Sequence, residues 1–179
     1  IKVNGQIQAY SGDKIVKINR QWTQNDVVEL QLPMEMSYSY WFENSLGIER
    51  GPLVYALKIG ESWREVKTDE FTDTFYEITP TTPWNYGIPV QHVKADSMKV
   101  AVKSGISDYP WNVENAPVSI TVKGKKIPFW EKSQNSAGRP PYPSHPFQEL
   151  GTPLEEITLI PYGCTTLRIA QFPLVDRHK

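Results

Sequence analysis

The sequence predicts an all-β fold, a two-sheet antiparallel β-sandwich of jelly-roll type with long proline-rich loops. About ten short segments alternate apolar and polar residues, which is the period of a strand. Aromatic residues make up 12% of the chain and prolines number 15, a composition that favours strands and turns over helices. Because short strands with turn signals between them are typical of sandwiches, we expect one sandwich domain over residues 1–179, with a barrel as the alternative.

The first half of the chain predicts a meander of strands. Asn4-Gly5 lies between short apolar alternations and is a pair that tight hairpin turns favour. Alternation predicts three further strands, at 14–20, 26–32 and 36–42. The segment 48–59 is largely apolar on both faces after Pro52, and this predicts a strand in the middle of a sheet.

The second half contains two long segments without regular periodicity. We expect loops at 60–97 and 133–153, the second being either a covering flap or partly mobile. Alternation predicts strands at 98–103 and 118–122, the latter ending in a turn at 123–126. The last two strands, 156–162 and 165–172, are expected to form a hairpin joined at Gly163-Cys164.

Composition and charge argue against several classes of partner. A net charge of −1 gives no electrostatic reason to expect nucleic acid or an anionic membrane. No apolar run approaches the ~18 residues of a membrane span. Cys164 is the only cysteine, so no internal disulfide can form, and we expect it to be a small buried packing residue. The chain begins with Ile1 and shows no signal segment, so we expect a piece of a longer protein.

No set of reactive groups converges in the sequence, so we expect neither a catalytic residue nor a metal in this chain. The histidines lack the spacing of metal ligands, and there is no G-x-S-x-G motif or glycine-rich phosphate loop. Glu155 and Glu156 are neighbours on an expected strand, so they point to opposite faces and cannot act as a facing carboxylate pair. Calcium held by loop oxygens stays open, because such a site needs no tight motif.

Aromatic residues in loops provide the one binding hypothesis. Trp84-Asn85-Tyr86 combines two rings on which a sugar could stack with an amide able to hydrogen-bond hydroxyls. Trp111 and Trp130 lie in or beside other loops and complete the candidate carbohydrate-binding set. The competing interpretation, which we favour, is that these side chains anchor loops at the ends of the sandwich.

Three motifs give the chain a family resemblance. Residues 18–34, INRQWTQNDVVELQLPM, resemble the R-x-W…GD-x-V-x-L-x-LPM run of the glycoside hydrolase family 127 group, which includes bacterial β-L-arabinofuranosidases. Residues 48–55, IERGPLVY, are similar to its ERGPLVY segment, and residues 156–162, EITLIPY, to its C-terminal ITLIPY strand. The motifs follow the family's order, with Asn25 where many relatives have glycine.

The resemblance implies a non-catalytic C-terminal β-sandwich region of a larger carbohydrate-active enzyme. In that family the chemistry belongs to an N-terminal (α/α)₆ barrel with a zinc, its cysteine and glutamate ligands, a cysteine nucleophile and a glutamate acid. None of these carries over, because Cys164 follows the IPY motif, far from the place of the catalytic cysteines. The implied partner is this barrel, no cofactor is expected in this chain, and export is favoured by analogy.

Two roles follow from this resemblance and from the loop aromatics. An accessory domain that packs on the barrel predicts an exposed apolar patch, lined by some of Tyr38, Tyr40, Trp41 or the 71–90 loop. The alternative is a carbohydrate-binding module for plant-type oligosaccharides. The sequence leaves the identity of the sugar open.

Overall fold

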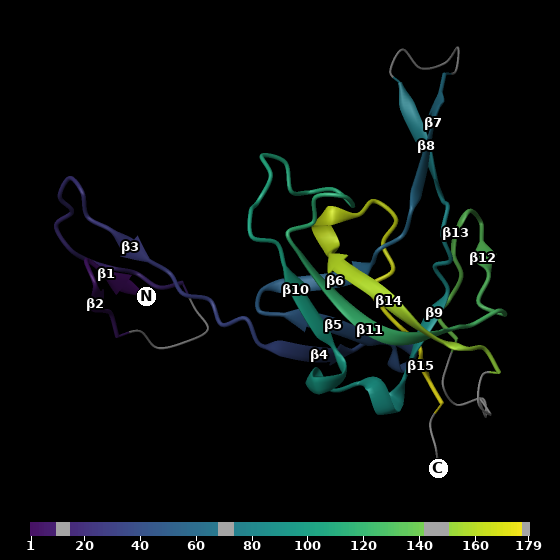
Figure 1. The fold of residues 1–179 in the computed structure, drawn as a ribbon. Coiled ribbons are helices and arrows are strands. Elements are labelled where there is room, and N and C mark those ends of the chain that lie inside the picture. The colour runs from purple at the N-terminus through teal and green to yellow at the C-terminus, as the bar shows by residue number, and fades with distance from the viewer. Residues whose placement is uncertain (10–14, 68–73, 142–150, 177–179) are drawn as a thin grey trace. The chain divides into compact units, whose positions relative to one another are not determined.

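The computed structural model describes residues 1–9, 15–67, 74–141 and 151–176 (Figure 1). Contacts between residues divide the chain into two compact units, Ile1–Met34 and Glu35–Lys179. The sandwich-like sheet lies within the second unit. The expectation of one domain over 1–179 stays a prediction.

The first unit is a small antiparallel sheet of three short strands. β1 (Lys2–Val3) lies in the middle and pairs with β2 (Gln6–Ile7) and β3 (Val28–Glu29). Asn4 and Gly5 form the β1–β2 turn with φ values of 50° and 77°, so the hairpin predicted from this pair is confirmed.

One strand prediction in the first unit is wrong, and a second is right only in part. Residues 15–20 form no strand, and residue 14 lies outside the described residues. The strand expected at 26–32 is reduced to Val28–Glu29. The alternation of Val28, Leu30 and Leu32 suggested a buried face, but all three side chains are exposed. Alternation specifies a strand only where one face is covered, and the described residues of the first unit supply no cover here.

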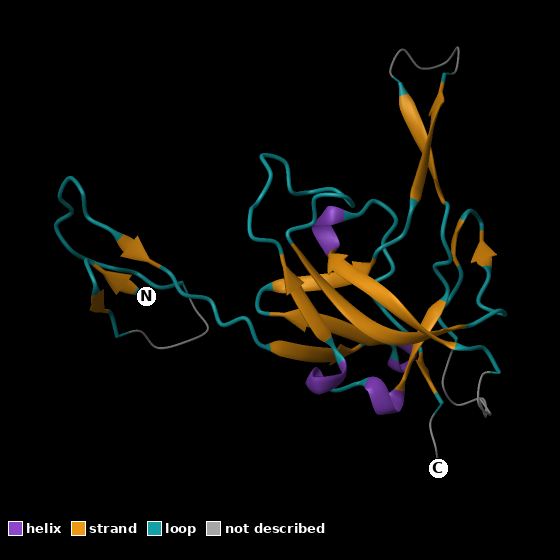
Figure 2. Ribbon diagram, in the orientation of Figure 1, coloured by secondary structure: helices purple, strands orange, loops and turns teal. Residues whose placement is uncertain are grey.

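The second unit is built on an eight-stranded sheet, and its helices are single 3₁₀ turns (Figure 2). The strands lie in the order β15-β9-β11-β14-β6-β5-β4, and β10 pairs with β11 outside this path. All pairs are antiparallel except β15 with β9. The strands are β4 (Met36–Tyr40), β5 (Leu46–Arg50), β6 (Leu53–Leu57), β9 (Tyr86–Pro89), β10 (Lys99–Val102), β11 (Val118–Lys126), β14 (Leu154–Pro161) and β15 (Leu174–Val175).

The sheet is curled, and residues 169–175 join its two ends. Phe172 exchanges two backbone hydrogen bonds with Leu46 of β5, at 2.8 and 2.9 Å. Two residues later, Leu174 pairs with Ile88 of β9. The same segment therefore contacts strands near both edges of the sheet. Side chains from opposite parts of the curled sheet meet inside it. The predicted all-β, sandwich-like fold is confirmed.

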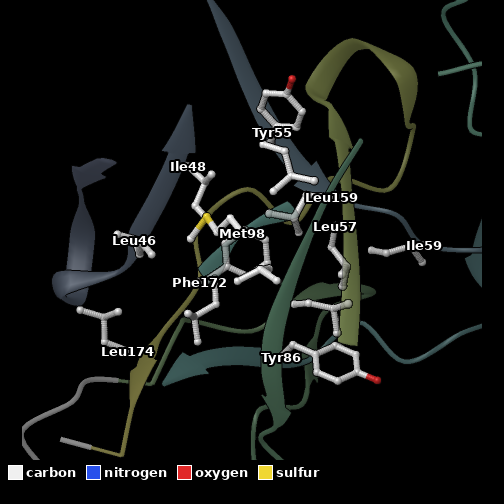
Figure 3. Close-up of a cluster of buried hydrophobic side chains, with 14 of the residues drawn as sticks. Leu46, Ile48, Tyr55, Leu57, Ile59, Tyr86, Met98, Leu159, Phe172 and Leu174 are labelled. Carbon is white, nitrogen blue, oxygen red and sulfur yellow. The ribbon is translucent and has the colours of Figure 1, made fainter. Parts of the chain in front are cut away.

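The core fills the inside of the curl (Figure 3). Val118, Ile120 and Val122 of β11 alternate with half-buried residues, as the sequence predicts for this strand. They meet large buried side chains from the other strands, which are Leu46, Ile48, Tyr55, Leu57, Ile88, Leu159 and Phe172. Each such side chain contributes about 1.5–3 kcal/mol on burial. Cys164 is 1% exposed in a smaller cluster, so its prediction as a packing residue is confirmed.

The segment 48–59 is a hairpin and not one strand. β5 and β6 pair with Arg50 opposite Leu53, so Gly51 and Pro52 form the turn, and Gly51 takes a φ of 57°. The second half of the prediction is confirmed, because β6 lies between β5 and β14 within the sheet. The sequence does not predict the turn, because a proline is also tolerated at or just ahead of the first residue of a strand.

Both loop predictions are wrong in part. Residues 60–97 contain the β7 (Glu61–Val66) and β8 (Phe75–Pro80) hairpin as well as β9, and residues 132–137 form the β12 (Lys132–Ser133) and β13 (Ser136–Ala137) hairpin. Most side chains of these hairpins are exposed on both faces, so no apolar alternation marks them. Residues 142–150 lie outside the described residues.

Two further boundaries differ from prediction. The turn expected at 123–126 is strand, because β11 continues through these residues opposite Leu154–Glu156 of β14. The prediction of a terminal hairpin is wrong. Residues 162–164 form the 3₁₀ turn η4 (Tyr162–Cys164), and residues 165–172 form no strand that pairs with β14. That segment instead runs past β6, where the Leu57 N–H donates to the Ile169 carbonyl.

Candidate functional site

A cleft of about 500 Å³ opens in the second unit beside Trp84. Its walls come from β8, the β12–β13 hairpin and the segment 166–169, with Trp84 and Ile59 between them. We call it the Trp84 cleft. Its volume lies within the range of about 300–1,000 Å³ that small-molecule sites occupy.

One wall is β8 of the β7–β8 hairpin. The two strands pair over their full length, from Glu61 opposite Pro80 to Val66 opposite Phe75. An edge-to-face contact between Trp63 and Tyr76, with ring centroids 5.8 Å apart, adds a cross-strand contact. Ile78 and Pro80 give this wall apolar surface, and Glu77 and Thr79 give it polar groups.

A second wall is the β12–β13 hairpin. Gln134 and Asn135 form its two-residue turn with φ values of 49° and 62°, the conformation of a type I′ turn. At its base, the Trp130 Nε1–H donates to the Gly138 carbonyl at 2.8 Å. The hairpin thereby holds Lys132 and Asn135 at the cleft.

The third wall, residues 166–169, is bound at its start by the carboxylate of Glu61. Glu61 Oε1 accepts hydrogen bonds from the backbone N–H groups of Thr166 (2.8 Å) and Leu167 (3.1 Å) and from the Thr165 hydroxyl (3.2 Å). Partial burial opposes ionisation, but these hydrogen bonds outweigh it and hold the pKa of Glu61 below its ordinary value. Glu61 therefore fixes a wall of the cleft as an ionised group.

Three of the five sequence-predicted site residues lie together at the cleft or behind it. Trp84 is half-buried, lines the cleft, and makes an edge contact with Trp130, with ring centroids 5.2 Å apart. Trp130 itself is 3% exposed. The Asn85 amide donates to the backbone carbonyls of Ile127 (2.9 Å) and Trp130 (3.3 Å). Trp130 and Asn85 thus support Trp84 from behind.

Tyr86 points to a different neighbour. It is 6% exposed, and its hydroxyl donates to Glu155 at 2.8 Å. Burial raises the pKa of Tyr86 to about 12, and the bonded carboxylate adds to the rise. The same hydrogen bond lowers the pKa of Glu155. Glu156 points away to Lys123, so the prediction that the two glutamates face opposite sides is confirmed.

Trp111 lies apart from this group. It is 54% exposed, and its ring lies next to Gly163 of η4. The structure therefore presents Trp84 as the one residue of the predicted set that lines the cleft, with Asn85 and Trp130 as its support.

The polar lining of the cleft was missed by sequence reasoning. Glu77, Lys132, Asn135 and Arg168 come from three distant segments, which the pattern assigned to two loops and a strand. No local spacing connects these residues. The one available signal was the pair Gln134-Asn135, because polar residues that tolerate positive φ mark tight turns.

Each of the two units also exposes apolar surface. Among the described residues of the first unit, Val3 is in the core, whereas eight large apolar side chains are exposed: Ile7, Ile15, Trp22, Val27, Val28, Leu30, Leu32 and Met34. In the second unit, Tyr40, Trp41 and Phe42 are 56–60% exposed at and just after β4, the edge strand of the sheet. Of the predicted patch residues, Tyr38 is half-buried.

Within the described ranges, no three His, Cys, Asp or Glu side chains gather as a group that could hold a metal ion. The same residues contain no helix long and apolar enough to cross a membrane. Comparison of the chain with protein families, with curated proteins and with solved structures found no match.

Proposed function

We propose that this chain is the non-catalytic C-terminal β-sandwich region of a glycoside hydrolase similar to family 127, and that it packs on the (α/α)₆ barrel of its own polypeptide. Three motifs support the resemblance, at 18–34, 48–55 and 156–162. The observation that carries the accessory role is the exposed apolar surface of the first unit.

The energetic argument starts from the size of that surface. Burying one Val, Leu or Ile side chain yields about 1.5–3 kcal/mol, so covering most of the eight exposed side chains would yield on the order of 10 kcal/mol. Large exposed apolar surfaces mark places where a protein contacts a partner. A barrel in the same chain fits as the partner, because a covalent link raises its effective concentration. In this proposal any zinc and the acid–base chemistry belong to the barrel.

Activity and association test the proposal together. The isolated chain should show no turnover of aryl arabinofuranosides, and measurable turnover would overturn the non-catalytic role. The chain should also bind the barrel when the two parts are produced separately. Leu30→Ser, in the exposed surface of the first unit, should weaken this association at least tenfold. Val102→Ser is the control, because Val102 is equally exposed on β10.

A second function is carbohydrate binding at the Trp84 cleft. Its support is the combination of an indole wall, apolar side chains such as Ile78 and Leu167, and hydrogen-bonding groups such as Asn135 and Ser136. Sugar rings present both C–H faces and hydroxyl groups, so they match this mixture. Calorimetry with plant-type oligosaccharides tests it, and absence of binding at millimolar sugar would exclude it.

A further inference from the structure

We propose that the Trp84 cleft selects an acidic saccharide, whose anionic group is bound by Lys132 and Arg168. This inference rests on the proposed carbohydrate binding at the cleft and adds the chemical class of the ligand. It follows from the charges that line the cleft, from the partners those charges already have, and from the shape of the walls.

The cleft has more positive charge available than negative charge. Among the described residues that line it, Glu77 is the one carboxylate, and it forms an ion pair with Arg64. Lys132 and Arg168 also line the cleft, and neither forms an ion pair with an acid among the described residues. Two cations therefore remain for a ligand, while the carboxylate is already neutralised.

Arg168 is held in place for such a role. Its Nε–H donates to the Thr165 carbonyl at 2.9 Å, and its guanidinium lies 4.7 Å from the centroid of the Tyr162 ring. Thr165 is in turn bound by Glu61. The remaining guanidinium donors form a fixed fork, and this geometry matches the paired oxygens of a carboxylate or a sulfate.

Lys132 supplies a second charge from the facing hairpin. It lies in β12, two residues before the tight turn at Gln134-Asn135, so its backbone is fixed while its long side chain stays adjustable. An anion between Lys132 and Arg168 would link the two walls of the cleft.

The rest of the lining favours a sugar over a free inorganic anion. Trp84 offers a ring face, and its position is fixed by the contact with Trp130. Thr79, Asn135 and Ser136 offer hydroxyl and amide groups for sugar hydroxyls. A uronic acid and a sulfated sugar share this chemistry, because both carry an anionic group on a ring that can stack.

Calorimetry on the chain 1–179 tests the inference with three ligands of equal length: an oligogalacturonate, a sulfated galactan oligosaccharide and a neutral arabino-oligosaccharide. We expect at least one acidic ligand to bind tenfold more tightly than the neutral one. This preference should fall with added salt, because it is electrostatic. The stronger of the two acidic ligands identifies the anion.

Lys132→Gln should reduce the acidic preference to below about threefold. Lys99→Gln is the matched control, because it removes the same charge from an exposed strand outside the cleft. Trp84→Ala should weaken all three ligands.

Equal binding of acidic and neutral ligands by the wild type would overturn the acidic selection and leave carbohydrate binding standing. Absence of binding for all three at millimolar concentration would overturn both. An acidic preference that survives Lys132→Gln, or one that Lys99→Gln abolishes, would place the anion elsewhere and overturn the inference.

Discussion

Replacing Glu61 should show how much its carboxylate contributes to the free energy of unfolding. Glu61→Ala removes the acceptor for the Thr166 and Leu167 N–H groups and the Thr165 hydroxyl. Hydrogen bonds to charged groups contribute about 1.5–3 kcal/mol each when buried, and this site is only partly buried. We therefore expect Glu61→Ala to lower the free energy of unfolding by about 3 kcal/mol.

Glu61→Gln keeps the size of the side chain and one oxygen acceptor but removes the charge. Neutral hydrogen bonds are roughly half as strong, so we expect a loss of about 1 kcal/mol at pH 7. The folded pKa of Glu61 lies below its ordinary value of 4.5, so the stability that the charge contributes is present above that value. It is lost as the pH falls through the folded pKa. The difference between wild type and Glu61→Gln should therefore shrink in acid.

Urea unfolding followed by tryptophan fluorescence, at pH 7 and in acid, measures both quantities. Glu65→Gln is the control, because Glu65 lies on the same strand and contacts Lys67 in an exposed ion pair, which contributes little. A loss below 0.5 kcal/mol in Glu61→Ala, or a Glu61→Gln difference that does not depend on pH, would refute the proposed support of the 166–169 wall.

Three further predictions concern the core of the sheet. Tyr86 should ionise with a pKa of about 12 in an ultraviolet titration. The free energy of unfolding should fall between pH 10 and about 12, because the raised folded pKa stabilises the protein only while the phenol stays protonated. Tyr86→Phe should remove this pH-dependent loss. Gly87→Ala should destabilise the fold by about 1–3 kcal/mol in thermal unfolding, because the Cβ of the new alanine would lie 2.8 Å from the Pro173 carbonyl oxygen. Gly105→Ala is the control and should be near neutral, because there is open space around Gly105. Leu159→Ala should cost about 2–5 kcal/mol in urea unfolding, because Leu159 is fully buried, and Leu154→Ala on the same strand should cost less than half as much.

The sequence predicted those parts of the fold where one face of a strand is covered. β11 follows from alternation because every second side chain of it is buried along most of its length. Alternation also predicted β10, although its four residues are all exposed, and Asn4-Gly5 specified its own turn. The β7–β8 and β12–β13 hairpins left no such pattern, because most of their side chains face solvent on both sides. The hairpin at Gly51-Pro52 is not predicted by the sequence, because a Gly-Pro pair is also compatible with the start of a single strand.

The site was predictable only through its aromatic residue. Trp84 stood out because a tryptophan in a turn-rich segment needs an explanation, and it does line the cleft. Lys132 and Arg168 were not identified, since they approach the cleft from segments that are distant in sequence. Their positions depend on tertiary contacts such as the hydrogen bonds of Glu61 to residues 165–167. A local sequence pattern cannot predict contacts between residues that are so far apart in the sequence.

Hydroxyl-radical footprinting of tryptophans tests the accessory role most directly. Trp22, Trp41, Trp63 and Trp111 have similar exposed fractions, between 50% and 58%, so they should label comparably in the isolated chain 1–179. In the protein that joins this chain to its barrel, we predict strong protection of Trp22, which lies in the exposed apolar surface of the first unit, with Trp63 and Trp111 labelled as before. Equal labelling of all four in both proteins would contradict the proposal that this apolar surface packs on the barrel.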